Sequence, residues 1–240
     1  MLLPRAILFD LDDTILSFER RSLVLESLAA RTPQWFAPVT PKAAAEAIEA
    51  RFKVFWADQA WHKAWRPRLA EARRMLIAQA FEALMAAGAR GLTLIQAHEF
   101  ADEFHTRRET EMTLFPGALE TVDALKARGV RLALVTNGQS ETQRGKIERF
   151  DLGRRFDHIQ IEGEHGFGKP EERAYRHALQ ALGVEAHETW MVGDNLEWEV
   201  AAPQRLGIFG IWHDHLGDGL PADSLIRPDR IIRSLTELLV

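Results

Sequence analysis

The chain has 240 residues, of which 46% are hydrophobic and 27% are charged, as is ordinary for a globular protein. The net charge of -5 argues against a nucleic-acid binder, which needs a basic face. Cysteine is absent, which excludes disulfides, thiolate zinc sites and a cysteine nucleophile. The apolar N-terminal stretch is broken by Pro4, Arg5 and Asp10, so it is too short for a signal peptide or a membrane span. We therefore expect a cytoplasmic protein that binds neither nucleic acid nor membrane.

The first feature along the chain is the apolar run from Ala6 to Phe9, which predicts a strand buried on both faces. Acidic residues follow it at Asp10, Asp12 and Asp13. Side chains two apart on an extended chain point the same way and stand about 6.6 Å apart, so Asp10 and Asp12 share one face. Two carboxylates held together favour a raised pKa or a bound cation. The alternative is a loop whose acids cap the following helix.

The next part of the chain is expected to be helical. From Ile15 to Arg31 the apolar spacing predicts a helix. From Pro38 to about Met112 alanine dominates, strand-like runs are missing, and apolar residues recur at helical spacing. This block therefore predicts a domain built of helices alone.

Beyond this block, strand and helix patterns alternate. The expected strands cover residues 130–135, 156–161, 189–192, 208–212 and 230–232. Ser140 and Gln143 have capping-box spacing for the helix after the first of these strands. Such alternation predicts an α/β fold with a doubly wound, Rossmann-like parallel sheet. The expected core then comprises residues 1–17 and 112–240, with an inserted helical domain at 18–111.

Polar clusters fall at the carboxyl ends of the expected strands, where open parallel sheets bind their ligands. Asp10 and Asp12 follow the first strand, Thr136 and Asn137 the second, and Asp194 a later one. We therefore expect these side chains to meet at one edge of the sheet.

Together these pieces resemble the haloacid dehalogenase superfamily of hydrolases, over essentially the whole chain. The residues that carry the resemblance are, in the order of its four motifs, Asp10-Leu11-Asp12-Asp13-Thr14, Thr136-Asn137-Gly138, Lys169-Pro170 and Gly193-Asp194. The helical insert lies where the family places a cap domain. The segment from Thr142 to Ile147 is similar to the subgroup of acylneuraminate 9-phosphatases and nucleotide 5′-phosphatases.

The resemblance implies a phosphatase that forms an aspartyl phosphate on Asp10. Asp12 is then the general acid that protonates the leaving oxygen and later the base that takes a proton from water. The implied cofactor is Mg²⁺, held by the carboxylates of Asp10 and Asp194 and by the backbone carbonyl of Asp12. The implied phosphate ligands are Thr136, Asn137 and Lys169.

One departure from the family pattern lies in the fourth motif. The family often has a second aspartate four or five residues after the first, whereas this chain has Glu197 and Glu199. Glu199 stands where the longer version places that aspartate. We leave both glutamates outside the expected metal ligands, with orientation of Lys169, a water-mediated metal contact or a surface role as the alternatives for Glu199.

The expected partner is a small phosphorylated metabolite, either a sugar phosphate or a nucleotide, and the expected state is a monomer or homodimer. A phosphomutase shares the same core residues and is an alternative. A dehalogenase is disfavoured because dehalogenases of this family lack an acid at the position of Asp12. A binding or regulatory protein on the same scaffold is the alternative outside enzymes, and it is disfavoured because Asp10, Asp12, Thr136, Lys169 and Asp194 are all present.

Overall fold

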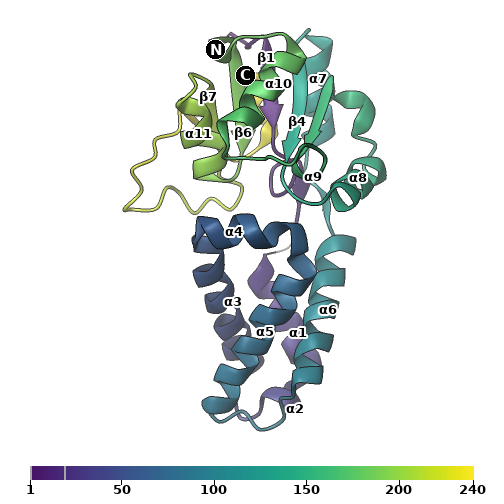
Figure 1. The fold of residues 1–240 in the computed structure, drawn as a ribbon, viewed down its shortest axis with the longest axis vertical. Coiled ribbons are helices and arrows are strands. Elements are labelled where there is room, and N and C mark those ends of the chain that lie inside the picture. Colours follow the sequence, from purple (N-terminus) through teal and green to yellow (C-terminus); the bar gives the residue numbers. More distant parts are fainter. Residues whose placement is uncertain (1, 19) are drawn as a thin grey trace. The chain divides into compact units, whose positions relative to one another are not determined.

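The computed structural model of the protein describes residues 2–18 and 20–240. The chain divides into two compact units (Figure 1). The first, here called the α/β unit, comprises Met1–Ser17 and Thr113–Val240, and the second, the helical unit, comprises Phe18–Met112. The boundaries expected from the sequence lie after residues 17 and 111, so the second differs by one residue from that of the structure.

The α/β unit contains a parallel sheet with the strand order β5-β4-β1-β6-β7-β8. Its strands are β1 (Ala6–Phe9), β4 (Arg131–Thr136), β5 (His158–Ile161), β6 (Thr189–Gly193), β7 (Phe209–His213) and β8 (Arg230–Ile232). Strand order reverses at β1, which pairs with β4 on one side and β6 on the other. The predicted α/β fold class is confirmed, and the ends of β1, β4 and β6 form the point where such folds bind ligands.

Helices accompany the sheet strands. They are α7 (Ala118–Ala127), α8 (Ser140–Arg149), α9 (Glu162–His165), α10 (Glu172–Leu182) and α11 (Ala202–Gln204), with a π-helical turn η4 (Leu196–Ala201) before α11. Every residue of β1 is buried. Ala6 and Leu8 share a buried apolar cluster with Tyr175 and Ala178 of α10. Because side chains alternate along a strand, Ile7 and Phe9 face the other side of the sheet.

The predicted helix from Ile15 to Arg31 was wrong at its start. Leu16–Ser17 form the short strand β2, which pairs antiparallel with β3 (Thr113–Leu114), and helix α1 begins only at Arg21. The pairing joins residues nearly a hundred positions apart, so no local pattern in the sequence indicates it. These paired strands carry the chain out of the α/β unit and back.

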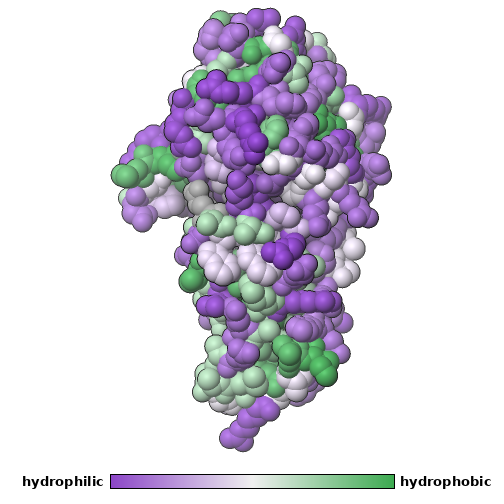
Figure 2. Space-filling model, viewed as in Figure 1, coloured by the Kyte–Doolittle hydropathy of each residue, from purple (hydrophilic) through white to green (hydrophobic). Residues whose placement is uncertain are grey.

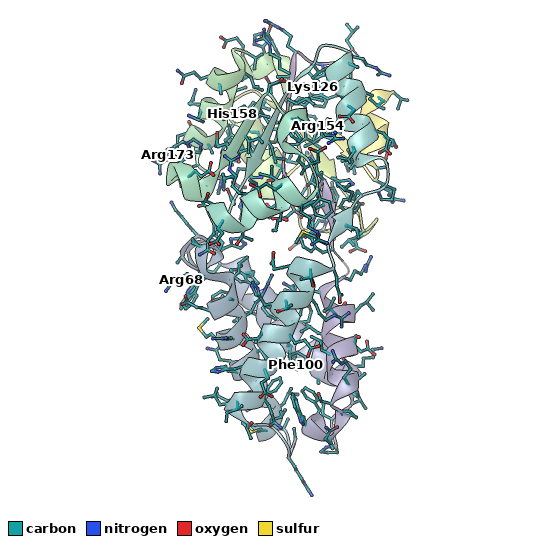
Figure 3. The ribbon with its side chains drawn as sticks, turned by 90° about the vertical axis from the view of Figure 1, so that its right-hand side faces the viewer. Arg68, Phe100, Lys126, Arg154, His158 and Arg173 are labelled. Atoms are coloured by element: carbon teal, nitrogen blue, oxygen red, sulfur yellow. The ribbon has the colours of Figure 1, made fainter. Side chains whose placement is uncertain are left out.

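The helical unit is built as a ring of four long helices. Its helices are α1 (Arg21–Arg31), α2 (Pro33–Phe36), α3 (Pro41–Ala57), α4 (Gln59–Trp65), α5 (Leu69–Ala86) and α6 (Leu94–Thr110). α1 contacts α3 and α6, and α5 contacts the same two helices, which closes the ring. Between these helices, the aromatic side chains of Phe36, Phe81 and Phe100 pack edge to face (Phe100 is labelled in Figure 3).

The surface of the α/β unit contrasts with its apolar core. The face drawn in Figure 2 is mainly hydrophilic over the α/β unit. Among the residues that the structure describes, none of the helices is both long and apolar enough to cross a membrane.

Candidate active site

Asp10 is the first residue after β1, and only 8% of it is exposed. Its backbone N–H donates to the carbonyl of Val192 in β6 at 3.0 Å, which continues the pairing of the two strands. Asp13 has a φ of 57°, a left-handed conformation that aspartate tolerates better than most residues. The chain therefore turns directly after Asp12 and keeps both predicted catalytic carboxylates at the end of β1.

Lys169 joins two buried carboxylates. Its Nζ lies 2.5 Å from Oδ1 of Asp10 and 2.7 Å from Oε1 of Glu199. Burial raises the pKa of Asp10, and Lys169 opposes that rise. Burial alone lowers the pKa of Lys169, but the carboxylates of Asp10 and Glu199 outweigh it and raise that pKa. Lys169 is therefore held as a cation beside the predicted nucleophile.

Glu199 reaches Lys169 from the π-helical turn η4. Its Oε2 accepts a hydrogen bond from the backbone N–H of Asn195 at 2.9 Å. Burial raises the pKa of Glu199 to about 7, with Lys169 acting in the opposite direction. A Cβ on Gly193 would lie 2.0 Å from Cγ of Glu199, so only glycine fits there. Glu197, by contrast, pairs with Arg205 at 2.8 Å on the surface.

Asn137 contacts the backbone of Lys169 through both ends of its side-chain amide. Nδ2 donates to the Lys169 carbonyl and Oδ1 accepts from the Lys169 N–H, each at 2.9 Å. A Cβ on Gly168 would lie 2.4 Å from Oδ1 of Asn137, so the close approach again depends on a glycine. These bonds tie the loop after β4 to the loop that carries Lys169. Direct contact of Asn137 with substrate stays a prediction.

Two residues of α8 contact Asp12, and the sequence analysis assigned neither to the site. Nζ of Lys146 lies 2.9 Å from Oδ1 and 3.0 Å from Oδ2 of Asp12. Nε2 of Gln143 donates to Oδ2 of Asp12 at 3.0 Å and to Oγ1 of Thr136 at 2.6 Å. The structure therefore brings Asp12 and Thr136 together through α8.

The capping-box interpretation of Gln143 was wrong. The residue before α8 is Gln139, and no side-chain cap closes that end of the helix. A signal in the sequence was available, because Ile147 is the single large apolar side chain in Ser140–Arg149. A helix with so little apolar surface must turn polar residues inward, and Gln143 and Lys146 are the ones that it buries.

Asp194 follows β6, and its backbone carbonyl accepts a hydrogen bond from Nε1 of Trp212 at 2.7 Å. Burial raises the pKa of Asp194 well above its usual range, and the carboxylates of Asp13, Glu199 and Asp10 add to the rise. Such mutual repulsion is relieved by a bound cation. Asp10 and Asp194, the two predicted carboxylate ligands, therefore lie close enough for the charge of Asp10 to add to the rise in the pKa of Asp194.

The donor atoms at this edge suit a hard cation such as Mg²⁺. They are carboxylate and carbonyl oxygens, which Mg²⁺ prefers, and Mg²⁺ usually keeps several waters. Across residues 2–18 and 20–240 there is no group of three acidic or histidine side chains arranged to hold a metal. The predicted metal ligands include only two carboxylates, those of Asp10 and Asp194, together with the backbone carbonyl of Asp12. The residues present therefore fit a weakly chelated, partly hydrated ion.

A family model described as haloacid dehalogenase-like hydrolase matches residues 4–207. The chain therefore belongs to the haloacid dehalogenase-like hydrolases, which confirms the family predicted from the four motifs.

Among the proteins that the chain resembles are several phosphatases. The chain is 34% identical to a phosphoserine phosphatase of Thermus thermophilus, over 98% of each chain. It is 36% identical to the N-acylneuraminate-9-phosphatase of Rattus norvegicus, over 45% of this chain and 44% of the other. These relatives group the chain with the phosphatases of the family, as predicted.

The fold also agrees with a solved structure. The Bacillus subtilis HAD-hydrolase YfnB, determined with bound magnesium, has a TM-score of 0.70 and 24% identity, and the match covers 99% of this chain and 97% of that one. At this identity the likeness concerns the fold alone.

Proposed function

We propose that the chain is a Mg²⁺-dependent phosphatase that hydrolyses a small phosphomonoester through an aspartyl phosphate on Asp10. The observation that supports this most is the buried pair of Lys169 and Asp10, with their 2.5 Å contact, beside a second acid cluster at Asp194. A carboxylate nucleophile meets an anionic phosphate only where nearby positive charge offsets the repulsion. Lys169 supplies such charge from the protein itself.

The proposed reaction has two steps. A carboxylate oxygen of Asp10 attacks phosphorus, the ester P–O bond breaks, and the leaving oxygen takes a proton from Asp12. Water then attacks phosphorus and gives a proton to Asp12 while the bond between phosphorus and the Asp10 oxygen breaks, which releases phosphate and restores Asp10. One residue thus serves as acid and then as base, which requires a carboxyl group close to the nucleophile on a fixed loop.

The side chains around the phosphoryl group have separate tasks in this proposal. The hydroxyl of Thr136 binds a phosphoryl oxygen, Lys169 neutralises its charge, and Asn137 holds the Lys169 backbone in place. The carboxylates of Asp10 and Asp194 and the carbonyl of Asp12 would hold Mg²⁺. When bound, this ion would offset phosphate charge in both steps.

The two units have different proposed roles. Residues 1–17 and 112–240 carry every residue named above and form the catalytic core. We infer that residues 18–111 are the cap domain, which sets substrate choice and limits water access. Phosphoserine is the first substrate to test, because a relative that matches over nearly the whole chain is a phosphoserine phosphatase. The sugar phosphates and nucleotides expected from the sequence follow.

The test measures phosphate release from phosphoserine, sugar phosphates and nucleotides, with Mg²⁺ and with a chelator. We expect metal-dependent turnover of at least one substrate, and we expect Asp10→Asn to abolish it while the circular dichroism spectrum stays unchanged. Turnover by Asp10→Asn would remove Asp10 from the nucleophile role. Isomerisation of a sugar phosphate without release of free phosphate would instead favour a phosphomutase.

A further inference from the structure

The carboxylate of Asp12 is held by two side chains from one helix. Lys146 and Gln143 lie three residues apart on α8, so they share a face of that helix. The Lys146 ammonium lies within 3.0 Å of both oxygens of Asp12, and the Gln143 amide lies 3.0 Å from one of them. The carboxylate is thus contacted on both oxygens by donors from one rigid element.

Lys146 is buried, which distinguishes its contact with Asp12 from an ordinary surface ion pair. Only 8% of its side chain is exposed, whereas 34% of the Asp12 side chain is exposed. A lysine is seldom buried unless a carboxylate compensates its lost hydration. Arg144, on the same helix, has an ordinary surface arrangement instead and pairs with Glu164 at 2.7 Å. Among these two cations of α8, Lys146 is the one directed at the site.

Proton transfer depends on where the Asp12 carboxyl group points. A general acid acts only within about 2.6–3.2 Å of the atom that it protonates, so free rotation of a partly exposed aspartate lowers the rate. We propose that Lys146 is a positioning residue that holds the Asp12 carboxyl group for proton transfer to the leaving oxygen. This inference rests on the proposed function, because it assigns Lys146 to the acid step of that reaction.

The experiment compares the wild-type protein with the Lys146→Met variant, both as the full chain. Each protein is tested on two substrates that differ in their leaving group. The substrates are p-nitrophenyl phosphate, whose leaving group departs without protonation, and the alkyl phosphate that the wild-type enzyme hydrolyses best. In a mechanism with a phosphoenzyme, kcat/KM reports the steps up to its formation, which include leaving-group protonation. General acid catalysis contributes about 10²- to 10⁴-fold. We expect Lys146→Met to lower kcat/KM for the alkyl phosphate at least about tenfold more than for the aryl phosphate.

Two further variants give the comparison its controls. Arg144→Met removes a cation from the same helix without touching Asp12, and we expect it to leave the ratio of the two kcat/KM values unchanged. Lys146→Arg keeps a cation that can donate to both carboxylate oxygens, and we expect it to restore much of the ratio. If Lys146→Met does not fold, as judged by circular dichroism, Lys146→Gln takes its place with the same expectation.

Equal loss on both substrates, or no loss on either, would overturn the assignment of Lys146. Failure of the proposed function has a different signature, which is wild-type protein without metal-dependent phosphate release or Asp10→Asn with undiminished activity. The two failures are therefore read from different variants.

Discussion

Two buried lysines each pair with a different carboxylate that we propose to be catalytic, and this division of charge is the main feature among the single residues. Lys169 pairs with Asp10 and Glu199, and Lys146 pairs with Asp12. A buried charge that loses its partner costs several kcal/mol, so Lys169, which lies between two buried carboxylates, contributes to stability as well as to the chemistry proposed here.

Lys169→Met leaves Asp10 and Glu199 buried together without a cation. We expect unfolding in urea at pH 8 to show a loss of about 3 kcal/mol, because both carboxylates are ionised in the unfolded chain. Turnover should fall at least about 10²-fold, as is usual when one charge-stabilising group is removed. The double variant Lys169→Met with Glu199→Gln should regain part of the lost stability. A double variant less stable than Lys169→Met would show that repulsion between the two acids is not the cause.

His213 makes stability depend on pH. It ends β7 with 1% of its surface exposed, and its ring lies against Phe115 at 4.9 Å between centroids. Burial, aided by His215, lowers the pKa of His213 from 6.5 to about 4. Above pH 6.5 the ring is neutral whether the chain is folded or unfolded. Below it the unfolded chain binds a proton that the folded chain resists, so stability falls as pH falls toward 4.

Between pH 7 and pH 5 this histidine should remove about 2 kcal/mol from the free energy of unfolding. His213→Asn should be less stable than wild type at pH 7 but lose less stability on acidification, as measured by urea unfolding at both values. The control His187→Asn removes an exposed histidine and should leave the wild-type pH dependence intact. An unchanged pH dependence in His213→Asn would assign the acid sensitivity to other groups.

At the scale of elements, short helices that follow sheet strands carry the groups that complete the site. α8 follows β4 and supplies Gln143 and Lys146, and the π-helical turn η4 follows β6 and supplies Glu199. α8 has only one large apolar side chain, Ile147, so polar contacts with the site residues determine much of its buried face. η4 buries Val200 beside Glu199, so apolar packing and the contact with Lys169 act together there.

Gly193 and Gly145 test how closely these elements approach the site. A Cβ at Gly193 would lie 2.0 Å from Cγ and 2.7 Å from Cδ of Glu199, so Gly193→Ala must displace Glu199. We expect a loss of about 1–3 kcal/mol and reduced turnover. Gly145 lies inside α8 with nothing within 4 Å, so Gly145→Ala should gain up to about 1 kcal/mol. Thermal unfolding of both variants provides the measurement. Equal effects at the two positions would contradict the close contact.

At the scale of the whole molecule, charge is concentrated rather than spread evenly. The chain carries a net charge of only -5, yet Asp10, Asp13, Asp194 and Glu199 interact with one another in the α/β unit. Lys169 offsets only part of this charge. The native fold should therefore be more stable with a divalent cation than without one.

We expect Mg²⁺ to raise the melting temperature of the wild-type protein. At a concentration about 100 times the dissociation constant, binding to the folded state alone adds about 2.7 kcal/mol. Asp194→Asn removes one proposed ligand and should reduce the shift strongly, without any substrate present. Sodium chloride at the same ionic strength is the control for general screening. An equal Mg²⁺-induced shift in Asp194→Asn would argue against Asp194 as a ligand.

The α/β class, the helical insert and the polar residues at the strand ends could be predicted from the amino-acid sequence. These follow from local patterns: apolar runs predict buried strands, helical spacing predicts the insert, and acids directly after Phe9 lie at a strand end wherever the strand pairs. The neighbours of β1 in the sheet and the β2–β3 pairing came only from the structure, because they join distant segments.

Which donor pairs with which acceptor is known only from the folded chain. Asn137 was expected on the substrate, and its side chain bonds to the Lys169 backbone; Glu199 was left with several alternatives, and it contacts Lys169. Gln143 was expected to cap α8 and Lys146 had no assigned role, and both side chains contact Asp12. Residue type and spacing specify which groups are available. Their pairing depends on distances between elements that only the folded chain fixes.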